Sequence, residues 1–581
     1  MHSLFRLLAC AAALTMIAAC SGDDTTAPTP TPIPPAAVAS VTLSPDSSIV
    51  GVGFTQSLIA VPRDAAGNPM TGRQIAWASS APAIARVDGT GVVTAVAVGR
   101  AVITATSGNR SAQSPVLVRG IIPVSSVSVT TALDTLEAWD DLNLAAVVRD
   151  SNQNVLTDRA VRWTSSNPAV ARVDSVTGVL TGVDRGTVTV TATSEGASGT
   201  ASRVVVIKYR SLVAGTQHSC DIASGGIVWC WGQNGAEGRI GMPALGATVI
   251  SSQPVRIPNF GPEGIRARKL ASFGRHTCAL DVTGKAWCWG GNGWGALGVS
   301  AIAQSATPVA VSGGLTFKDI VVGPEYSCAL EQAGATYCWG HNDWRQFAMN
   351  APSMSESPVA VAPQLRFASL TAGSTFTCGV TTTSQGYCWG YSGWGNLGDG
   401  ADISYGNTFS ATPALIAGGH AWAQLGGGQI HTCGLTTAGQ GYCWGNNGGK
   451  LGNGGTLESS TPAMLQGAPT FTNLAVGANH TCAISASANV WCWGLNGNGQ
   501  VGQAASEVVT RAAQVPTLTA AEVAASGIAT GGGAHTCAVT ADRLTVKCWG
   551  RNDTGQLGTG NTSGEAVAQV TPATVVGQKP L

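Results

Sequence analysis

Short apolar stretches that alternate with polar residues run through most of the chain, and turn-forming residues separate them. In the stretch "IAWASSAPAIARVDGTGVVTAVAVGRAVITATS", which begins at Ile75, apolar side chains recur at about every second position between breaks of glycine, proline and serine. This period of two is typical of strands with one buried face. Apolar stretches with a helical period are scarce beyond the first twenty residues. The pattern therefore predicts an all-β protein.

Two neighbouring segments, 38–119 and 124–207, are copies of each other. The second contains "VRWTSSNPAVARVDSVTGVLTGVDRGTVTVTATS", which aligns with the stretch quoted above. Each copy places one tryptophan, Trp77 or Trp163, in a predicted strand, and we interpret both as core residues of a small β-sandwich without a disulfide. The run W-x-S-S-x-P and the strands after it resemble the bacterial immunoglobulin-like domain, group 2. That resemblance implies a surface spacer, sometimes an adhesive one.

From residue 209 the chain repeats a different unit seven times, and each unit contains two cysteines. If Cys278 and Cys288 face each other on antiparallel strands, Asp281 lies opposite Lys285 and Gly284 is the third residue of the loop. Three-residue hairpin loops favour a left-handed residue, usually glycine, at that third position. Glycine recurs there in three other repeats (Gly226, Gly334 and Gly439), whereas Ser384 and Ala488 replace it in two.

Directly opposed cysteines on paired strands are close enough for a disulfide. All fourteen cysteines after Cys20 belong to such pairs, so the sequence predicts one disulfide within each repeat. The predicted pairs are Cys220–Cys230, Cys278–Cys288, Cys328–Cys338, Cys378–Cys388, Cys433–Cys443, Cys482–Cys492 and Cys537–Cys548.

A zinc site is the alternative interpretation of these cysteines. A histidine stands two residues before the first cysteine in five repeats, on the same strand face, and His-x-Cys with a second cysteine offers three zinc ligands. Tyr326 and Phe376 replace the histidine in repeats three and four, although both cysteines remain. This favours a packing role, and we predict no metal and no cofactor. The five histidines are His218, His276, His431, His480 and His535.

The motifs "HTCAL", "YCWG" and "NDTGQLG" resemble the regulator of chromosome condensation repeat in its bacterial, cysteine-containing form, over all of 209–581. Seven such repeats imply a seven-bladed β-propeller. A proline-containing segment follows every Cys-Trp-Gly, and none precedes the first repeat. We therefore expect the C-terminal "QVTPATVVG" to complete the sheet that "SLVAGTQHSCDI" begins, which would close the ring and remove open edges. The prolines are Pro254, Pro308, Pro358, Pro413, Pro462, Pro516 and Pro572.

The N-terminus is expected to be a targeting segment. Residues 1–19 contain one short apolar run, and "IAAC" resembles the bacterial lipobox, which implies cleavage before Cys20 and lipidation of its thiol. The alternative is an ordinary signal peptide with an incidental cysteine. Ser21 after the cysteine, rather than Asp, favours the outer membrane or the cell surface. Residues 20–37 are rich in proline and threonine and predict an extended tether.

Composition excludes some functions. Only 11% of residues are charged and the formal net charge is zero, so we predict no nucleic-acid partner. No serine-hydrolase or zinc-protease motif occurs, and Gly449-Lys450 fails as a phosphate loop because Leu451 replaces the serine or threonine. The founding eukaryotic relatives exchange guanine nucleotides on a small GTPase, but the predicted lipidation and disulfides indicate a chain outside the cytoplasm, which argues against that role. We predict that the protein is not an enzyme.

Three tryptophans stand four residues after the glycine of Cys-Trp-Gly in repeats two, three and four: Trp294, Trp344 and Trp394. On adjacent sheets at one height they would form an aromatic patch for an unknown protein or glycan. The alternative is that they fill gaps between sheets, as we expect of the Cys-Trp-Gly tryptophans such as Trp289. The sequence predicts an envelope- or surface-anchored binding protein. A structural envelope protein without a ligand, a propeller enzyme, and an inhibitor of β-lactamases are the alternatives.

Overall fold

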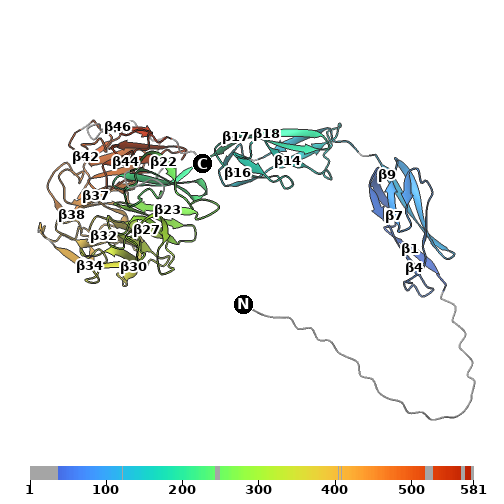
Figure 1. Ribbon diagram of the computed structural model, residues 1–581, viewed down its shortest axis with the longest axis horizontal. Coiled ribbons are helices and arrows are strands. Elements are labelled where there is room, and N and C mark those ends of the chain that lie inside the picture. Colours follow the sequence, from blue (N-terminus) through green and yellow to red (C-terminus); the bar gives the residue numbers. More distant parts are fainter. Residues whose placement is uncertain are drawn as a thin grey trace, which may run out of the picture. The chain divides into compact units, whose positions relative to one another are not determined.

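The computed structural model describes residues 37–576, apart from residues 121, 132, 404, 407, 505 and 517 and the segments 243–248, 519–527 and 564–568 (Figure 1). These residues form strands, turns and one 3-10 turn at Ser224–Gly226, without an α-helix, so the all-β class is confirmed. No helix of a length and hydrophobicity suited to crossing a membrane occurs in this part of the chain. Cys20, the signal segment and all but the last residue of the tether lie outside the described residues. The chain divides into two compact units, Met1–Pro123 and Val124–Leu581.

The first unit contains one β-sandwich. Its strands are β1 (Ser40–Ser44), β2 (Ser48–Gly51), β3 (Thr55–Ser57), β4 (Ile59–Arg63), β5 (Ala76–Ser79), β6 (Ala85–Val87), β7 (Val92–Ala95), β8 (Gly99–Ser107) and β9 (Arg110–Arg119). A four-stranded sheet in the order β2-β9-β8-β5 packs on a three-stranded sheet, β3-β7-β6, and β1 pairs with β4. Ile103 and Val93, one from each larger sheet, are fully buried in the shared core, and Trp77 packs against it.

The second unit begins with a β-sandwich of the same topology. Its strands are β10 (Ser126–Thr130), β11 (Thr135–Glu137), β12 (Asp141–Asn143), β13 (Ala145–Arg149), β14 (Arg162–Ser165), β15 (Ala171–Val173), β16 (Val179–Gly182), β17 (Gly186–Ser194) and β18 (Ala197–Val206). The sheets are β11-β18-β17-β14, β12-β16-β15 and β10-β13. Trp163 is buried in the core, as predicted for the tryptophan of this motif.

The repeats form seven consecutive sheets of four antiparallel strands each. The first four sheets are β19 (Tyr209–Ala214), β20 (His218–Ala223), β21 (Ile227–Gln233) and β22 (Ile250–Arg256); β23 (Ala267–Ser272), β24 (His276–Asp281), β25 (Ala286–Gly291) and β26 (Gln304–Ala310); β27 (Asp319–Val322), β28 (Tyr326–Leu330), β29 (Thr336–His341) and β30 (Met354–Val361); and β31 (Phe367–Ala372), β32 (Phe376–Thr381), β33 (Gly386–Tyr391) and β34 (Phe409–Leu415).

The last three sheets are β35 (Trp422–Gly427), β36 (His431–Thr436), β37 (Gly441–Gly445) and β38 (Ser459–Met464); β39 (Phe471–Val476), β40 (His480–Ser485), β41 (Val490–Leu495) and β42 (Val508–Gln514); and β43 (Ile528–Thr530), β44 (His535–Val539), β45 (Val546–Gly550) and β46 (Gln569–Thr574). The first strand of each sheet contacts the first strand of the next, and β43 contacts β19. The sheets therefore pack in series, with the seventh against the first.

The hairpin register follows the cysteine spacing. Cys278 lies directly opposite Cys288, the Asp281 N–H donates to the Lys285 carbonyl at 3.0 Å, and Gly284 is left-handed with φ +89°. Ser384 and Ala488 adopt the same left-handed conformation at φ +63° and +60°. The loop geometry is thus kept where glycine is replaced. All seven cysteine pairs form disulfides with Cα–Cα distances of 4.0–4.1 Å.

The prediction that the C-terminal strand completes the first sheet is wrong. β46 pairs with β45, and β19 pairs with β20, so each sheet consists of four strands that are consecutive in sequence. The proline-containing strand is the fourth strand of its own sheet because it follows the Cys-Trp-Gly strand and pairs with it directly. Pro254 lies where the register shifts between Cys230 and Gly232. Proline has no N–H to donate to the strand ladder. It is tolerated at such a bulge on an edge strand because the ladder is interrupted there.

The second β-sandwich is docked on the first repeat sheet through Trp139 and Glu137. Trp139 is left-handed at φ +70°, and its ring packs against the sandwich core and against the core between the first and last sheets. A Cβ on Gly225 would lie 2.5 Å from this ring, so the turn fits closely against the indole. Glu137 forms ion pairs with Lys208 and Arg210. The corresponding position of the first β-sandwich is Gly53, which has no such ring.

We expect Trp139→Gly to loosen this joint. Glycine relieves the left-handed backbone but removes the ring that packs on both cores, so the backbone around Lys208 and Arg210, whose side chains are already 42% and 54% exposed, should open more often. Limited trypsin digestion should cleave after these two residues several-fold faster, while the repeat sheets remain resistant. Trp139→Phe keeps an aromatic ring and serves as the control. Equal cleavage rates for Trp139→Gly and the parent would contradict the docking role.

Candidate binding face

In five of the seven repeats the tryptophan of Cys-Trp-Gly donates a hydrogen bond to the loop of the preceding sheet, whereas Nε1 of Trp493 and of Trp549 is buried without a hydrogen-bond partner among the described residues. Trp339 is fully buried, and its Nε1 donates to the Ala296 carbonyl at 2.9 Å. The Ser327 hydroxyl donates to the same carbonyl at 3.1 Å. Ala296 lies two residues after Trp294, so this pair of bonds holds the loop that presents the first candidate tryptophan. Equivalent indole bonds join Trp231 to Gln556, Trp289 to Arg239, Trp389 to Gln346 and Trp444 to Asn396.

The histidines that precede the cysteines are buried links between sheets. His276 Nε2 lies 2.9 Å from Ser327 Oγ of the next sheet, and burial lowers the pKa of His276 to about 4, so the ring is neutral. Tyr326 replaces this histidine in repeat three, and its hydroxyl accepts a hydrogen bond from Thr377 of the fourth sheet at 3.1 Å. The position therefore carries inter-sheet hydrogen bonds where it is histidine or tyrosine, whereas the Phe376 side chain of repeat four only packs. The described residues contain no group of three or more metal-ligating side chains.

The same contact occurs between the last and first sheets. His535 Nε2 lies 2.8 Å from Ser219 Oγ, and the Gln556 carbonyl accepts bonds from Ser219 and from Trp231. The first and last sheets also share one buried cluster that contains Tyr209 and Val575. This junction thus has the same side-chain chemistry as the junction between the second and third sheets.

Each of the three candidate tryptophans is paired with a second ring. Trp294 contacts His341 of the third sheet with centroids 4.4 Å apart, and Trp344 contacts Tyr391 of the fourth sheet at 5.4 Å. Trp394 contacts Tyr405 of its own loop at 5.1 Å. Trp294 is 39% exposed and the other two tryptophans are half-buried. These rings cover the junctions between sheets and also present surface to solvent.

We call these six residues the aromatic belt: Trp294, His341, Trp344, Tyr391, Trp394 and Tyr405. The sequence analysis missed the three partner rings. A signal for two of them exists, because the residue directly after Cys-Trp-Gly is aromatic only in repeats three and four, where it is His341 and Tyr391. Each of these repeats follows a repeat with a candidate tryptophan. Tyr405 belongs to a longer loop, and no repeat position marks it.

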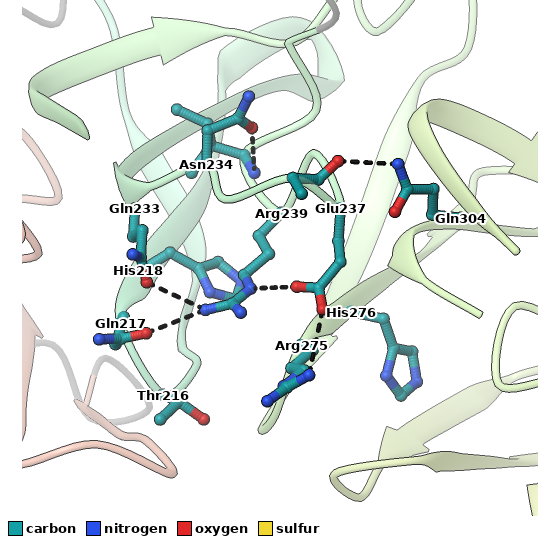
Figure 2. A network of polar contacts seen from close by, with 12 residues as sticks. Thr216, Gln217, His218, Gln233, Asn234, Glu237, Arg239, Arg275, His276 and Gln304 are labelled. Atoms are coloured by element: carbon teal, nitrogen blue, oxygen red, sulfur yellow. Dashed lines mark hydrogen bonds and ion pairs between the residues drawn. The ribbon is translucent and has the colours of Figure 1, made fainter. Parts of the chain in front are cut away.

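A polar network borders the belt at Trp294. Figure 2 shows Glu237 between Arg239 and Arg275, with Oε2 2.8 Å from Arg239 Nε and Oε1 3.2 Å from a terminal nitrogen of Arg275. Arg239 also donates to the side-chain oxygens of Gln217 and Gln233. Glu237 is mostly buried, whereas the Arg275 side chain is 68% exposed. The carboxylate is therefore held in place, and one guanidinium faces solvent.

A cavity of about 300 Å³ lies between this network and the belt. Four turns or loops of three successive sheets contribute to it: Glu237 from the first, Arg275 and Trp294 from two segments of the second, and Glu325 from the third. Gln304 at the start of β26 also lines it, and its Nε2 donates to the Ala236 carbonyl at 2.9 Å. An aromatic ring and fixed polar groups thus converge on one site.

Family models match segments of the two β-sandwich domains and of the repeats. Residues 37–118 and 123–205 match the bacterial Ig-like domain (group 2), and residues 438–484 and 471–500 match the regulator of chromosome condensation (RCC1) repeat. An Ig-like virion protein of Serratia phage KSP90 is 31% identical over 160 residues, which are 26% of this chain and 59% of the relative. The ultraviolet-B receptor UVR8 of Arabidopsis thaliana is 31% identical over 106 residues, 18% of this chain and 23% of the receptor. The chain thus spans less than two thirds of either relative.

Solved structures show the fold of the repeats. Yeast RCC1 (Prp20), in a crystal structure with Kap60 bound, has a TM-score of 0.52 and 20% identity, over 60% of this chain and 83% of that protein. Human WBSCR16 has a TM-score of 0.50 and 18% identity, over 56% of this chain and 85% of the human protein. At this identity the likeness establishes a β-propeller fold of the RCC1 type and nothing about partners.

The buried histidines should make the fold acid-sensitive. The pKa of His276 is about 4 in the folded state and 6.5 as the reference value, so the unfolded chain binds more protons between these values. The contribution of the neutral histidine to the free energy of unfolding is fully present above pH 6.5. It falls as the pH drops toward 4, by up to about 1.4 kcal/mol per pH unit for one such histidine. His276→Tyr, which copies Tyr326, should therefore reduce the loss of stability between pH 7 and pH 5.

Urea unfolding midpoints at several pH values measure this effect. The slope of stability against pH, rather than stability itself, is the relevant readout, because tyrosine also changes packing. Phe376→Tyr, which changes no histidine, is the control and should leave the slope unaltered. An unchanged slope in His276→Tyr would show that this histidine is not the acid-sensitive group.

Proposed function

We propose that this chain, which carries bacterial Ig-like domains and RCC1 repeats, is an extracytoplasmic binding protein whose aromatic belt recognises a protein or a glycan. The observation that carries the proposal is the belt itself. Three tryptophans occupy one repeat position on consecutive sheets, and solvent reaches their rings. Tryptophan is enriched among residues that dominate binding energy, because it offers a large rigid surface at small entropic cost.

The remaining architecture suits presentation of such a surface. Seven disulfides favour a protein of an oxidising compartment outside the cytoplasm. In our proposal Cys20 is lipidated at an outer membrane or cell surface, residues 20–37 form the tether, and the domains 38–119 and 124–207 are spacers. The propeller at 209–581 then has seven blades in a closed ring. Packing of the first and seventh sheets supports closure without a shared strand.

Relatives supply a precedent for the type of partner. The yeast RCC1 structure was determined with Kap60 bound, so a protein that contains this fold binds another protein. The low identity transfers no particular partner to this chain. Phosphate-loop, serine-hydrolase and zinc-protease motifs do not occur in the sequence. Recognition without catalysis is therefore the function that we propose.

Affinity capture tests the proposal. The full chain and a Trp294→Ala, Trp344→Ala, Trp394→Ala variant are used as bait against envelope and surface-polysaccharide fractions. Because the belt contributes most of the contact surface, capture by the triple variant should fall by about tenfold or more. Thermal unfolding of the variant establishes that it remains folded.

Leu457→Ala is the matched control for this experiment. Leu457 is 81% exposed in the corresponding loop of repeat five, outside the belt, so its loss should leave capture unchanged. Equal capture by the parent and the triple variant would exclude the belt as the recognition surface. Absence of any partner for the parent would instead favour a structural role.

A further inference from the structure

The cavity beside Trp294 has a composition that distinguishes it from the rest of the belt. Its lining combines one exposed indole with the carboxylates of Glu237 and Glu325, the guanidinium of Arg275 and the amide of Gln304. Its volume of about 300 Å³ is at the lower end of the range of about 300–1,000 Å³ for small-molecule sites. The ligand that fits is therefore small, or is one unit of a longer chain.

The charges of this site are compensated within the protein. Glu237 is paired with Arg239 and Arg275, and Glu325 lies 3.8 Å from His341 Nδ1. The two arginines and two glutamates sum to zero charge. An anionic ligand would face both carboxylates, and a cationic ligand would face Arg275, so neither gains from a net field. The site favours a neutral ligand with many hydrogen-bonding groups.

Donors and acceptors remain for such a ligand. A carboxylate has about four acceptor positions and a guanidinium has five N–H donors. Glu237 uses two acceptor positions for its arginines, and Arg275 donates one of its N–H groups to Glu237. Gln304 donates through Nε2 to Ala236 and keeps an amide oxygen as an acceptor. Because hydroxyl groups both donate and accept, this mixed set suits neighbouring hydroxyls on one ring.

The indole of Trp294 offers an apolar surface beside these polar groups. Trp294 lines the cavity, whereas its ring partner His341 does not, so part of the indole surface is available to a ligand. A pyranose ring carries C–H groups on its face and hydroxyls around its rim, and the C–H face packs on an aromatic ring. We infer that this cavity binds one neutral saccharide unit, stacked on Trp294 and hydrogen-bonded to Glu237, Arg275 and Gln304. The inference rests on the proposed function and names its ligand class.

The geometry of the site is rigid enough for selectivity. Arg239 is mostly buried and is held by Gln217 and Gln233, so it fixes Glu237 before any ligand binds (Figure 2). The loop of Trp294 is held by the bonds of Trp339 and Ser327 to the Ala296 carbonyl. A preformed site loses less conformational entropy on binding. We therefore expect discrimination between neutral and charged saccharides of equal size.

The test uses the full chain with arrays of neutral, amino-substituted and acidic disaccharides, and with acidic and basic peptides in parallel. Calorimetry on the best neutral disaccharide then compares Trp294→Ala and Arg275→Ala with Leu457→Ala. Leu457 is 81% exposed and lies outside both the belt and the cavity, so the last variant is the matched control. Each of the first two substitutions should weaken binding by about tenfold or more, and the control should match the parent.

Each alternative outcome overturns a defined statement. Binding of only charged disaccharides, or neutral binding that survives both Trp294→Ala and Arg275→Ala, would overturn the saccharide inference alone. Capture of a peptide through the belt with no saccharide bound would overturn the inference and leave the proposed function intact. Absence of binding to every probe, together with absence of partners in affinity capture, would overturn both.

Discussion

In five of the seven repeats, a hydrogen bond from a buried indole to a carbonyl of the neighbouring loop joins one sheet to the next. Trp339 forms this bond with Ala296, and the Ser327 hydroxyl reaches the same carbonyl. A carbonyl buried between sheets would cost free energy if it were unpaired, so the bond keeps the loop against the next sheet. A single four-stranded sheet cannot provide this partner itself. Order in each loop therefore depends on the neighbouring sheet, and the candidate binding face is a product of the stacking.

The disulfides and the hairpin glycines stabilise structure within one sheet, whereas the indole bonds join neighbouring sheets. Cys278 and Cys288 connect two central strands across a separation of ten residues, which reduces the freedom of the unfolded hairpin. They do not connect one sheet to another. Inter-sheet order depends on tryptophan, on hydroxyls and on the residue at the histidine position. This division explains why the cysteines are invariant among the repeats while that position accepts His276, Tyr326 or Phe376.

The features that depend on local sequence could be predicted. Hairpin register, loop conformation and cysteine pairing follow from spacing within about ten residues, and the tryptophan of Cys-Trp-Gly was correctly assigned to the core. The prediction that the C-terminal strand belongs to the first sheet is wrong. From the sequence alone, a proline-containing strand could pair with the Cys-Trp-Gly strand before it or with the first strand of another repeat. Its place is decided by the direct connection from β21 to β22 and by the bulge at Pro254. The partner rings of the belt depend on the stacking of different repeats, which periodicity alone does not describe.

The contact between His535 and Ser219 has a consequence for the history and engineering of the fold. Because the last junction repeats the histidine–hydroxyl contact found between the second and third sheets, this contact does not require the chain to begin or end at that junction. In the closed ring that we propose, a gene whose reading order is circularly permuted by whole repeats would encode the same set of inter-sheet contacts. The docking of Trp139 and Glu137 on the first sheet ties the start of the repeats to the preceding domain.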